Sequence, residues 1–202
     1  MKISRSGVLI ALGFLLLASS VALEAQNIST DRKGRESAEQ IVREFKEIVM
    51  ENSDEDLFPS VSNDPDENDS GGFVIVNDER YCGIISIPAI EIELPVSYGY
   101  SYEQMSESLC RYCGSIEGRN MIICGHNYKS FLQNLDKVNE GDSVIFTDYR
   151  GISYEYAVSE IQLIGGYERR KLIEGGSDWD LSVFTCNYSG YYRYVLRCKF
   201  KE

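Results

Sequence analysis

Apolar residues are clustered at the start of the chain and are spaced out further along it. An uncharged apolar run, residues 7–23, follows Lys2 and Arg5. A run of this length is within the range of a membrane-spanning helix, and a cleaved secretory signal has the same pattern. In both cases the preceding positive charges predict that everything after residue 25 lies outside the cytoplasm. We therefore assign residues 1–25 to a signal or anchor segment.

A helix and an acidic spacer are predicted for residues 26–72. Between Ser37 and Met50, apolar residues recur at helical spacing, which predicts a short amphipathic helix packed loosely on the surface of a domain. Residues 51–70 then contain eight acidic residues, no Lys or Arg, and two of the four prolines of the chain. Such a segment buries too little apolar surface to offset its chain entropy. We interpret it as a flexible spacer that would hold a folded domain away from a membrane.

From residue 73 the pattern changes to short runs rich in Ile, Val, Tyr and Phe, separated by Gly, Asp and Asn turn signals. Helical stretches are indicated only at Ser101–Tyr112 and Lys129–Leu135. About eight strands point to a closed barrel or a sandwich, so residues 73–202 are predicted to form one mostly β domain. The predicted strands are Phe73–Asn77, Gly83–Pro88, Glu91–Val96, Asn120–Cys124, Ser143–Thr147, Ser153–Ile164, Leu181–Cys186 and Tyr191–Phe200.

The net charge of −12 is concentrated in the connecting segment. Residues 24–72 carry 14 acids and 5 bases, a net charge of −9, which leaves −3 for the rest of the chain. Phosphate binding requires clustered Lys and Arg. A nucleic-acid partner is therefore excluded.

The six cysteines do not all have the same character. Cys124 and Cys198 sit inside apolar, strand-like runs, where a cysteine behaves as a small buried hydrophobe. Cys82, Cys110 and Cys113 could include one disulfide, because exported proteins use disulfides, but the sequence leaves the connectivity open.

Three residues combine into a candidate catalytic site. His126, the single histidine, follows a glycine at the end of an apolar strand, and Cys186 ends another predicted strand ahead of a loop. A thiolate is a nucleophile, and nearby positive charge increases the thiolate fraction. Histidine can give a proton to a leaving amine. Arg193, at the start of the next strand, can donate hydrogen bonds to a substrate carbonyl or an oxyanion.

Arg197 is a second candidate for the arginine role. It lies four residues after Arg193, so both side chains are expected on one face of the strand. We prefer Arg193 because it lies nearer to the loop that follows Cys186.

These segments resemble the motifs of the sortase family of surface transpeptidases. Ser182–Cys186 is similar to the family's Thr-Leu-x-Thr-Cys segment, and Gly125–Asn127 is similar to its strand-end Gly-His. Gly83–Pro88 and Leu94–Val96 resemble its Gly-x-Ile-x-Ile-Pro and Leu-Pro-Val segments. The family's arginine falls on Arg193. The motifs occur in the expected order, and the resemblance covers residues 73–200.

The resemblance implies a closed, eight-stranded, mostly antiparallel β-barrel with short helices. It implies that Cys186 attacks the Thr–Gly carbonyl of a Leu-Pro-x-Thr-Gly-like signal to form a thioacyl enzyme, while His126 protonates the departing amine. Arg193 completes the catalytic set, and Thr185 is assigned to substrate binding. The implied partners are secreted surface proteins or pilins and an amine from cell wall or pilin, at the outer face of a Gram-positive cell membrane. No cofactor or metal is expected.

Alternative functions remain at this stage. A cysteine peptidase that hydrolyses the acyl enzyme would share the same residues. Cys110, Cys113, Cys124 and His126 could also supply four zinc ligands, and a non-catalytic binding barrel would use its Cys and His only structurally. Ser182 and Val183 replace the family's usual Thr and Leu, and no long helix is inserted before Cys186. The sortase subclass therefore stays open.

Overall fold

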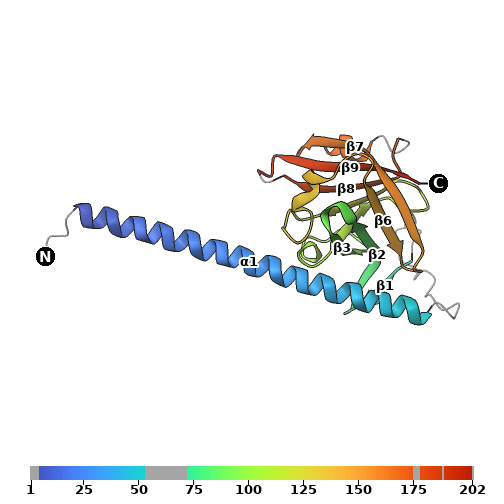
Figure 1. The fold of residues 1–202 in the computed structure, drawn as a ribbon, viewed down its shortest axis with the longest axis horizontal. Helices are drawn as coiled ribbons and strands as arrows, with labels where there is room; N and C mark the ends of the chain where they lie inside the picture. Colours follow the sequence, from blue (N-terminus) through green and yellow to red (C-terminus); the bar gives the residue numbers. More distant parts are fainter. Residues whose placement is uncertain (1–4, 53–71, 175–177, 188, 202) are drawn as a thin grey trace.

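The computed structural model describes residues 5–52, 72–174, 178–187 and 189–201. Figure 1 shows a β-barrel resting on one half of a long N-terminal helix, α1 (Arg5–Asn52), whose other half projects away from the barrel. The short helical elements are η1 (Pro88–Ile90), η2 (Gln104–Ser106), η3 (Gln133–Lys137) and α2 (Arg169–Ile173).

Eight strands form the closed barrel, and a ninth short strand is attached to it. The barrel order is β2-β3-β4-β5-β8-β9-β7-β6, and pairing of β6 with β2 closes the ring. β1 (Val74–Val76) pairs only with β2 in this arrangement. The barrel strands are β2 (Glu79–Ile87), β3 (Ile92–Ser97), β4 (Leu109–Cys113), β5 (Met121–Gly125), β6 (Ser143–Asp148), β7 (Ser153–Gly165), β8 (Leu181–Cys186) and β9 (Tyr192–Phe200).

Most neighbouring strands are antiparallel, with two exceptions. β3 pairs with β4 and β5 pairs with β8 in parallel. Because β5 and β8 are parallel, their carboxyl ends lie at the same edge of the sheet. This pairing is important for the site because the two strands are far apart in the sequence. The expected closed, mostly antiparallel eight-stranded barrel is thus confirmed.

Two apolar layers cover the two faces of the central strands. The barrel interior is filled by side chains that alternate along each strand, such as Ile123 on β5, Val183 on β8 and Leu196 on β9, all fully buried. On the outer face of the same strands lies a second set, which we call the outer cluster. Its buried members are Met105, Cys110, Ile122, Cys124, Ile164, Leu172, Trp179, Phe184 and Val195.

The barrel has eight strands, as predicted, but one of them is not among the predicted strands. The helix predicted for Ser101–Tyr112 was wrong over its second half, which forms β4, while only η2 in its first half is helical. The predicted strand at Phe73–Asn77 became β1, outside the closed ring. The short helix expected at Lys129–Leu135 appears as the slightly later η3.

Helix α1 joins the predicted anchor and the predicted amphipathic helix in one continuous element. There is no break at residue 25, and the helix predicted for Ser37–Met50 is its last part. Packing there is tight, because Ala38, Ile41 and Phe45 are at most 3% exposed. The predicted spacer at 51–70 lies almost wholly outside the described residues.

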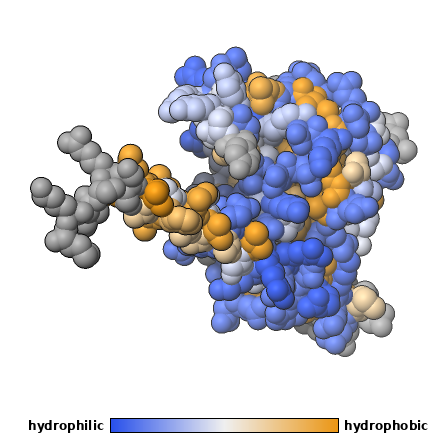
Figure 2. All heavy atoms as spheres, turned by 60° about the vertical axis from the view of Figure 1, so that its left-hand side comes forward, coloured by the Kyte–Doolittle hydropathy of each residue, from blue (hydrophilic) through white to orange (hydrophobic). Residues whose placement is uncertain are grey.

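The projecting half of α1 carries a largely apolar surface. Its large hydrophobic side chains from Val8 to Ile28 are between 49% and 70% solvent-exposed, and they form the orange arm in Figure 2. An 18-residue window of this helix has a mean hydropathy of 2.2 and none of it is buried against the domain. An N-terminal apolar helix of the length and composition needed to cross a membrane is therefore present.

Candidate active site

The three residues singled out from the sequence lie on adjacent strands of the barrel. β5 and β8 run parallel, with Gly125 opposite Thr185, so the residues that follow them, His126 and Cys186, come next to each other. In the antiparallel pair of β8 and β9, Cys186 lies directly opposite Arg193. Neighbouring strands are about 4.8 Å apart. The structure therefore brings His126, Cys186 and Arg193 together side by side.

Alternation along the strands places these three side chains on one face. Cys124, Phe184 and Val195 all belong to the outer cluster. His126, Cys186 and Arg193 are each two residues away from one of them, and residues two apart share a face. We call this line of His126, Cys186 and Arg193 the outer row.

The Asn187 side chain helps to hold the loop after Cys186. Asn187 accepts hydrogen bonds at its Oδ1 from the main chain of Tyr192, at 3.1 Å, and from the Ser189 hydroxyl, at 3.0 Å. Its own N–H donates to the Tyr192 carbonyl. Gly190 has φ of 73°, which favours glycine. The turn therefore fixes the end of β8 where the thiol lies.

Cys186 is the exposed thiol among the six cysteines, all of which lie in described residues. Four cysteines, Cys82, Cys110, Cys124 and Cys198, are buried, and Cys113 is half-buried. Burial raises the pKa of Cys110 and Cys124, and it raises the pKa of Cys198 to about 12. A thiol that is inaccessible and costly to ionise is a poor nucleophile. Cys186 alone combines access with a place on the outer row.

His126 is half-buried and packs against two aromatic rings. The Tyr102 ring meets it edge-on, with centroids 5.3 Å apart, and the Tyr128 ring lies tilted against it at 4.9 Å. Burial lowers the pKa of His126 below its ordinary value, because a charged imidazolium loses hydration there. In the register of β5 and β8, the position of His126 is next to that of Cys186.

The Arg193 guanidinium contacts a backbone carbonyl and an aromatic ring. Its Nη1 donates to the Gly166 carbonyl, in the loop after β7. Its Cζ lies 5.9 Å from the centroid of the Phe184 ring. The positive charge of Arg193 also acts on Cys124, whose pKa it partly lowers against the larger effect of burial. A fixed cation is therefore present at one end of the outer row.

Arg197, the second candidate, is 1% exposed and fully engaged elsewhere. Its guanidinium donates to the Leu172 carbonyl at 3.0 Å and to the Lys171 carbonyl at 2.8 Å, both on α2. It also donates to the Ser182 hydroxyl at 2.9 Å and lies 4.3 Å from the Trp179 ring centroid. Burial lowers its pKa. This arginine fastens α2 to the barrel and is separated from Cys186 by the length of β8.

The side chain of Thr185, which the sequence analysis assigns to substrate binding, lies on the other face of β8 from Cys186. It is 3% exposed, and its Oγ1 donates to the Gly125 carbonyl at 2.9 Å. The hydroxyl therefore links the two parallel strands immediately before His126 and Cys186. A side chain added at Gly125 would meet Leu109 and Leu132, so this position is packed too closely for anything larger than glycine.

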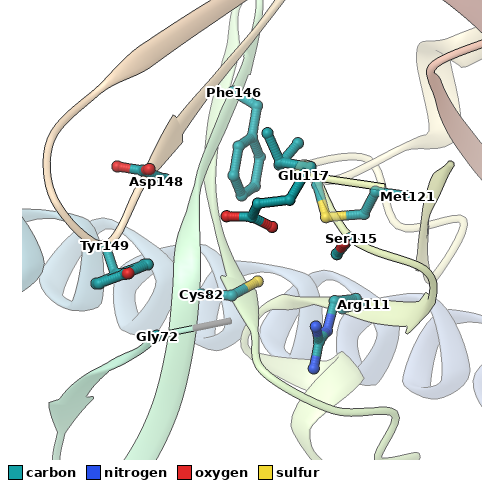
Figure 3. A pocket seen from close by; sticks show the side chains of 10 residues that line it. Gly72, Cys82, Arg111, Ser115, Glu117, Met121, Phe146, Asp148 and Tyr149 are labelled. Atoms are coloured by element: carbon teal, nitrogen blue, oxygen red, sulfur yellow. The ribbon is translucent and has the colours of Figure 1, made fainter. Parts of the chain in front are cut away.

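A small pocket lies elsewhere in the barrel. Figure 3 shows it lined by Cys82, Arg111, Met121 and Phe146, among others, from four different strands. Met121 is the first residue of β5, whereas His126 follows the last, so the pocket lies toward the opposite end of that strand. Within the described ranges, no group of three or more His, Cys, Asp and Glu side chains is arranged to hold a metal ion. The zinc alternative thus gains no support from the geometry.

Several contacts of the site were not found from the sequence. Tyr102 and Tyr128 lie against His126, and the Gly166 carbonyl accepts from Arg193. Only Tyr128 carried a signal, because it lies two residues after His126 in the chain. Tyr102 and Gly166 come from distant loops and reach the site through the barrel topology.

The comparisons with known proteins agree with this geometry. A family model described as a sortase domain matches residues 85–201. No curated protein matches the chain. Sortase C1 from Streptococcus agalactiae is similar in structure, with a TM-score of 0.53 and 25% identity over 63% of this chain and 71% of that one.

Two further solved structures align over most of both chains. Sortase C from Streptococcus pneumoniae has a TM-score of 0.58 and 21% identity, covering 81% of this chain and 97% of its own. The sortase D5 transpeptidase from Clostridium perfringens has a TM-score of 0.57 and 18% identity, covering 86% and 99%. The fold is shared across these proteins, and the family match extends from β2 to the end of β9. This chain therefore belongs to the sortase family of cysteine transpeptidases.

Proposed function

We propose that this sortase is anchored in a membrane and cleaves a Leu-Pro-x-Thr-Gly-like sorting signal. The acyl product would be transferred to an amine of cell wall or pilin. The observation that carries the proposal is the outer row, in which an exposed thiol lies between the strand positions of a histidine and an arginine. A nucleophile, a proton donor and a hydrogen-bond donor are then available at one strand edge.

In the first step, the thiolate of Cys186 attacks the carbonyl carbon of the Thr–Gly peptide bond. A carbon–sulfur bond forms, and the carbonyl π electrons move to oxygen to give a tetrahedral oxyanion. Arg193 donates hydrogen bonds to this oxygen or to a neighbouring substrate carbonyl. Its guanidinium cannot lose a proton at neutral pH, so it acts only as a donor.

His126, as imidazolium, gives its proton to the glycine nitrogen while the carbon–nitrogen bond breaks. The glycine amine leaves, and a thioester remains on Cys186. Burial lowers the pKa of His126, which makes its imidazolium a stronger proton donor and at the same time reduces the imidazolium fraction at neutral pH. An acceptor amine then attacks the thioester, giving a new amide and the free thiol.

The proposed partners follow from the family and the apolar helix. The solved sortase C of Streptococcus pneumoniae has pilin substrates, and secreted surface proteins or pilins with a C-terminal sorting signal are proposed here. The exposed apolar half of α1 supports an anchor in the cell membrane. The positive residues before it support an external catalytic domain.

The test is a peptide panel with a free amine, analysed by mass spectrometry. We expect wild-type protein to give an amide product with a Leu-Pro-x-Thr-Gly-like peptide, and Cys186→Ala to give neither product nor thioester. Cys198→Ala is the matched control, because this cysteine is buried in the barrel interior, and it should keep measurable activity.

Two results would count against the proposal. A covalent adduct on another cysteine, with Cys186 unmodified, would overturn the assignment of the nucleophile. Water-derived acid as the sole product, at every amine tested, would make the protein a hydrolytic cysteine peptidase instead.

A further inference from the structure

Helix α1 contacts the loop that carries His126 through a charged side chain. The loop of residues 126–132 follows β5, and we call it the His126 loop. The Asp31 carboxylate accepts from the Ser130 N–H at 3.0 Å and from the Ser130 hydroxyl at 2.8 Å. These two residues are separated by 99 positions in the sequence. The bonds therefore join the long helix directly to the segment after the histidine.

One turn later, α1 contacts a second loop as well. Gly34 is buried, and a Cβ placed there would lie 2.5 Å from the Ser106 carbonyl oxygen and 3.2 Å from the Phe131 ring. Ser106 belongs to the loop of residues 98–108 between β3 and β4, which we call the Tyr102 loop. The absence of a side chain at Gly34 thus lets the helix approach both loops closely.

Both loops carry a ring that packs on His126. Tyr102 comes from one and Tyr128 from the other. Phe131, which meets Gly34, is 1% exposed and packs edge-on against Tyr128 at 5.9 Å. Contacts therefore run from α1 through Phe131 and Tyr128 to His126, and from α1 through η2 to the Tyr102 loop.

We propose that the Asp31–Gly34 turn of α1 is a positioning element that fixes the two loops whose tyrosine rings pack on His126. Asp31 and Gly34 do not touch the outer row themselves. They act through Ser130, Ser106 and Phe131, which hold the loops bearing the two tyrosine rings. The same helix continues toward its exposed apolar end, so the proposed anchor and the support of the histidine are one element.

A change in the burial of His126 is the direct consequence to measure. If the loops loosen, the imidazole gains water and its lowered pKa rises toward the ordinary value. The groups that face the ring are Tyr102 and Tyr128, with Cys186 next to it on β8 and Arg193 beyond. Loss of the Asp31 charge would by itself favour the neutral ring and so lower the pKa of His126. This is opposite to the rise expected from loosened loops. An upward shift therefore reports loosening.

The experiment uses the full chain in detergent micelles, without a histidine tag. His126 is the single histidine, so one imidazole signal in an NMR titration belongs to it. The test variants are Asp31→Ala, Ser130→Ala and Gly34→Ala. The matched controls are Glu36→Ala, an exposed carboxylate paired with Arg32 on the same helix, and Gly13→Ala, where a Cβ would meet nothing within 4 Å.

We expect the three test variants to raise the pKa of His126 and to lower kcat about 10-fold with KM little changed, since a small misplacement of a catalytic group is costly. The controls should change neither. Asp31→Asn keeps an acceptor oxygen, so its His126 pKa and its kcat should stay close to those of the wild-type protein. Ser130→Ala removes the same hydrogen bonds from the loop side, in case Asp31→Ala lowers the yield of folded protein.

A lower melting temperature with an unchanged His126 titration and unchanged kcat would overturn the proposal, because α1 would then be only a structural support. The kinetic part rests on the proposed role of His126, whereas the titration does not. If His126→Ala retained full turnover, the proposed function would fail, and the NMR result would still decide whether the turn positions the ring.

Discussion

Two arginines on the same face of β9 have different surroundings, which separates their roles at the scale of single residues. Arg193 lies opposite Cys186. Arg197 is buried and donates hydrogen bonds to α2 and to Ser182. We expect Arg193→Ala to lower kcat by about 10²–10³ with little change in melting temperature. Arg193→Lys should be nearly as inactive, because an ammonium cannot reproduce the guanidinium fork.

Arg197→Ala should have the reverse pattern, a loss of roughly 2–4 kcal/mol in the free energy of unfolding because buried acceptors lose their donor. Kinetics and a denaturation curve for each variant distinguish the two. Normal turnover in Arg193→Ala would refute the assignment.

The pKa of His126 predicts a pH effect on stability. Its pKa in the folded protein is lowered by burial, below the value of about 6.5 expected in the unfolded chain. Between these two pKa values the unfolded chain binds more protons, so the free energy of unfolding decreases as the pH falls through this interval and is fully restored above it. His126→Gln should lose this part of the pH dependence, which thermal melts at pH 7 and pH 5 would measure. Parallel pH curves for the two proteins would contradict the prediction.

The sequence predicted the places of the candidate site residues in the fold better than their contacts. Cys186 ends one recognisable apolar strand and His126 follows another, so their positions at strand ends could be predicted. Thr185 shows the limit, because alternation turns its hydroxyl toward Gly125, and this orientation depends on the parallel register of β5 and β8. Tyr102 could not be found because no local pattern links residue 102 to residue 126.

At the scale of elements, β4 and α1 were the least predictable. Arg111 and the residues around it have a mixed polar and apolar pattern, and their strand conformation depends on pairing with β3 and β5. A tertiary contact therefore overrides the local preference. For α1, the apolar run and the amphipathic stretch have different periodicities, which made them look like two elements. Residues 24–36 between them include Asn, Ser, Thr, Asp and Gly, which are weak helix formers, and contacts of Asp31 and Gly34 with the barrel support the helix there.

Packing of α1 on the barrel gives a prediction about stability. Phe45 is 1% exposed and packs with Val74, Tyr81 and Ile84. Phe45→Ala removes a buried ring and should lower the free energy of unfolding by about 3 kcal/mol. Met50→Ala, at a position that is 74% exposed, should change it by less than about 0.5 kcal/mol. Equal stabilities in chemical denaturation would show that α1 does not contribute to the folded domain.

At the scale of the whole molecule, the proposed anchor predicts the behaviour of the protein during fractionation. The exposed apolar half of α1 should keep the full chain in the membrane fraction after washing with high salt, because salt weakens charge contacts but leaves apolar burial intact. Leu16→Arg places a charge in the middle of the run and should reduce retention, at a cost of about 2.5–3.5 kcal/mol. Mature protein free in the medium and beginning near residue 26 would show cleavage instead.

The uninterrupted course of α1 has a consequence for which substrates come within reach. Asp31 already contacts the barrel, and it follows the end of the apolar run by eight residues, a rise of about 12 Å along a helix. With the apolar half in a membrane, the Cys186 thiol would stay at a nearly constant distance from the membrane surface. The enzyme would meet its substrates by lateral diffusion. Such an enzyme would select its substrates by the distance of the sorting signal from the membrane as well as by the sequence of the signal. A sorting signal a few residues from its own membrane segment would come within reach of Cys186. The same signal on a long stalk would lie too far from the membrane to contact this residue.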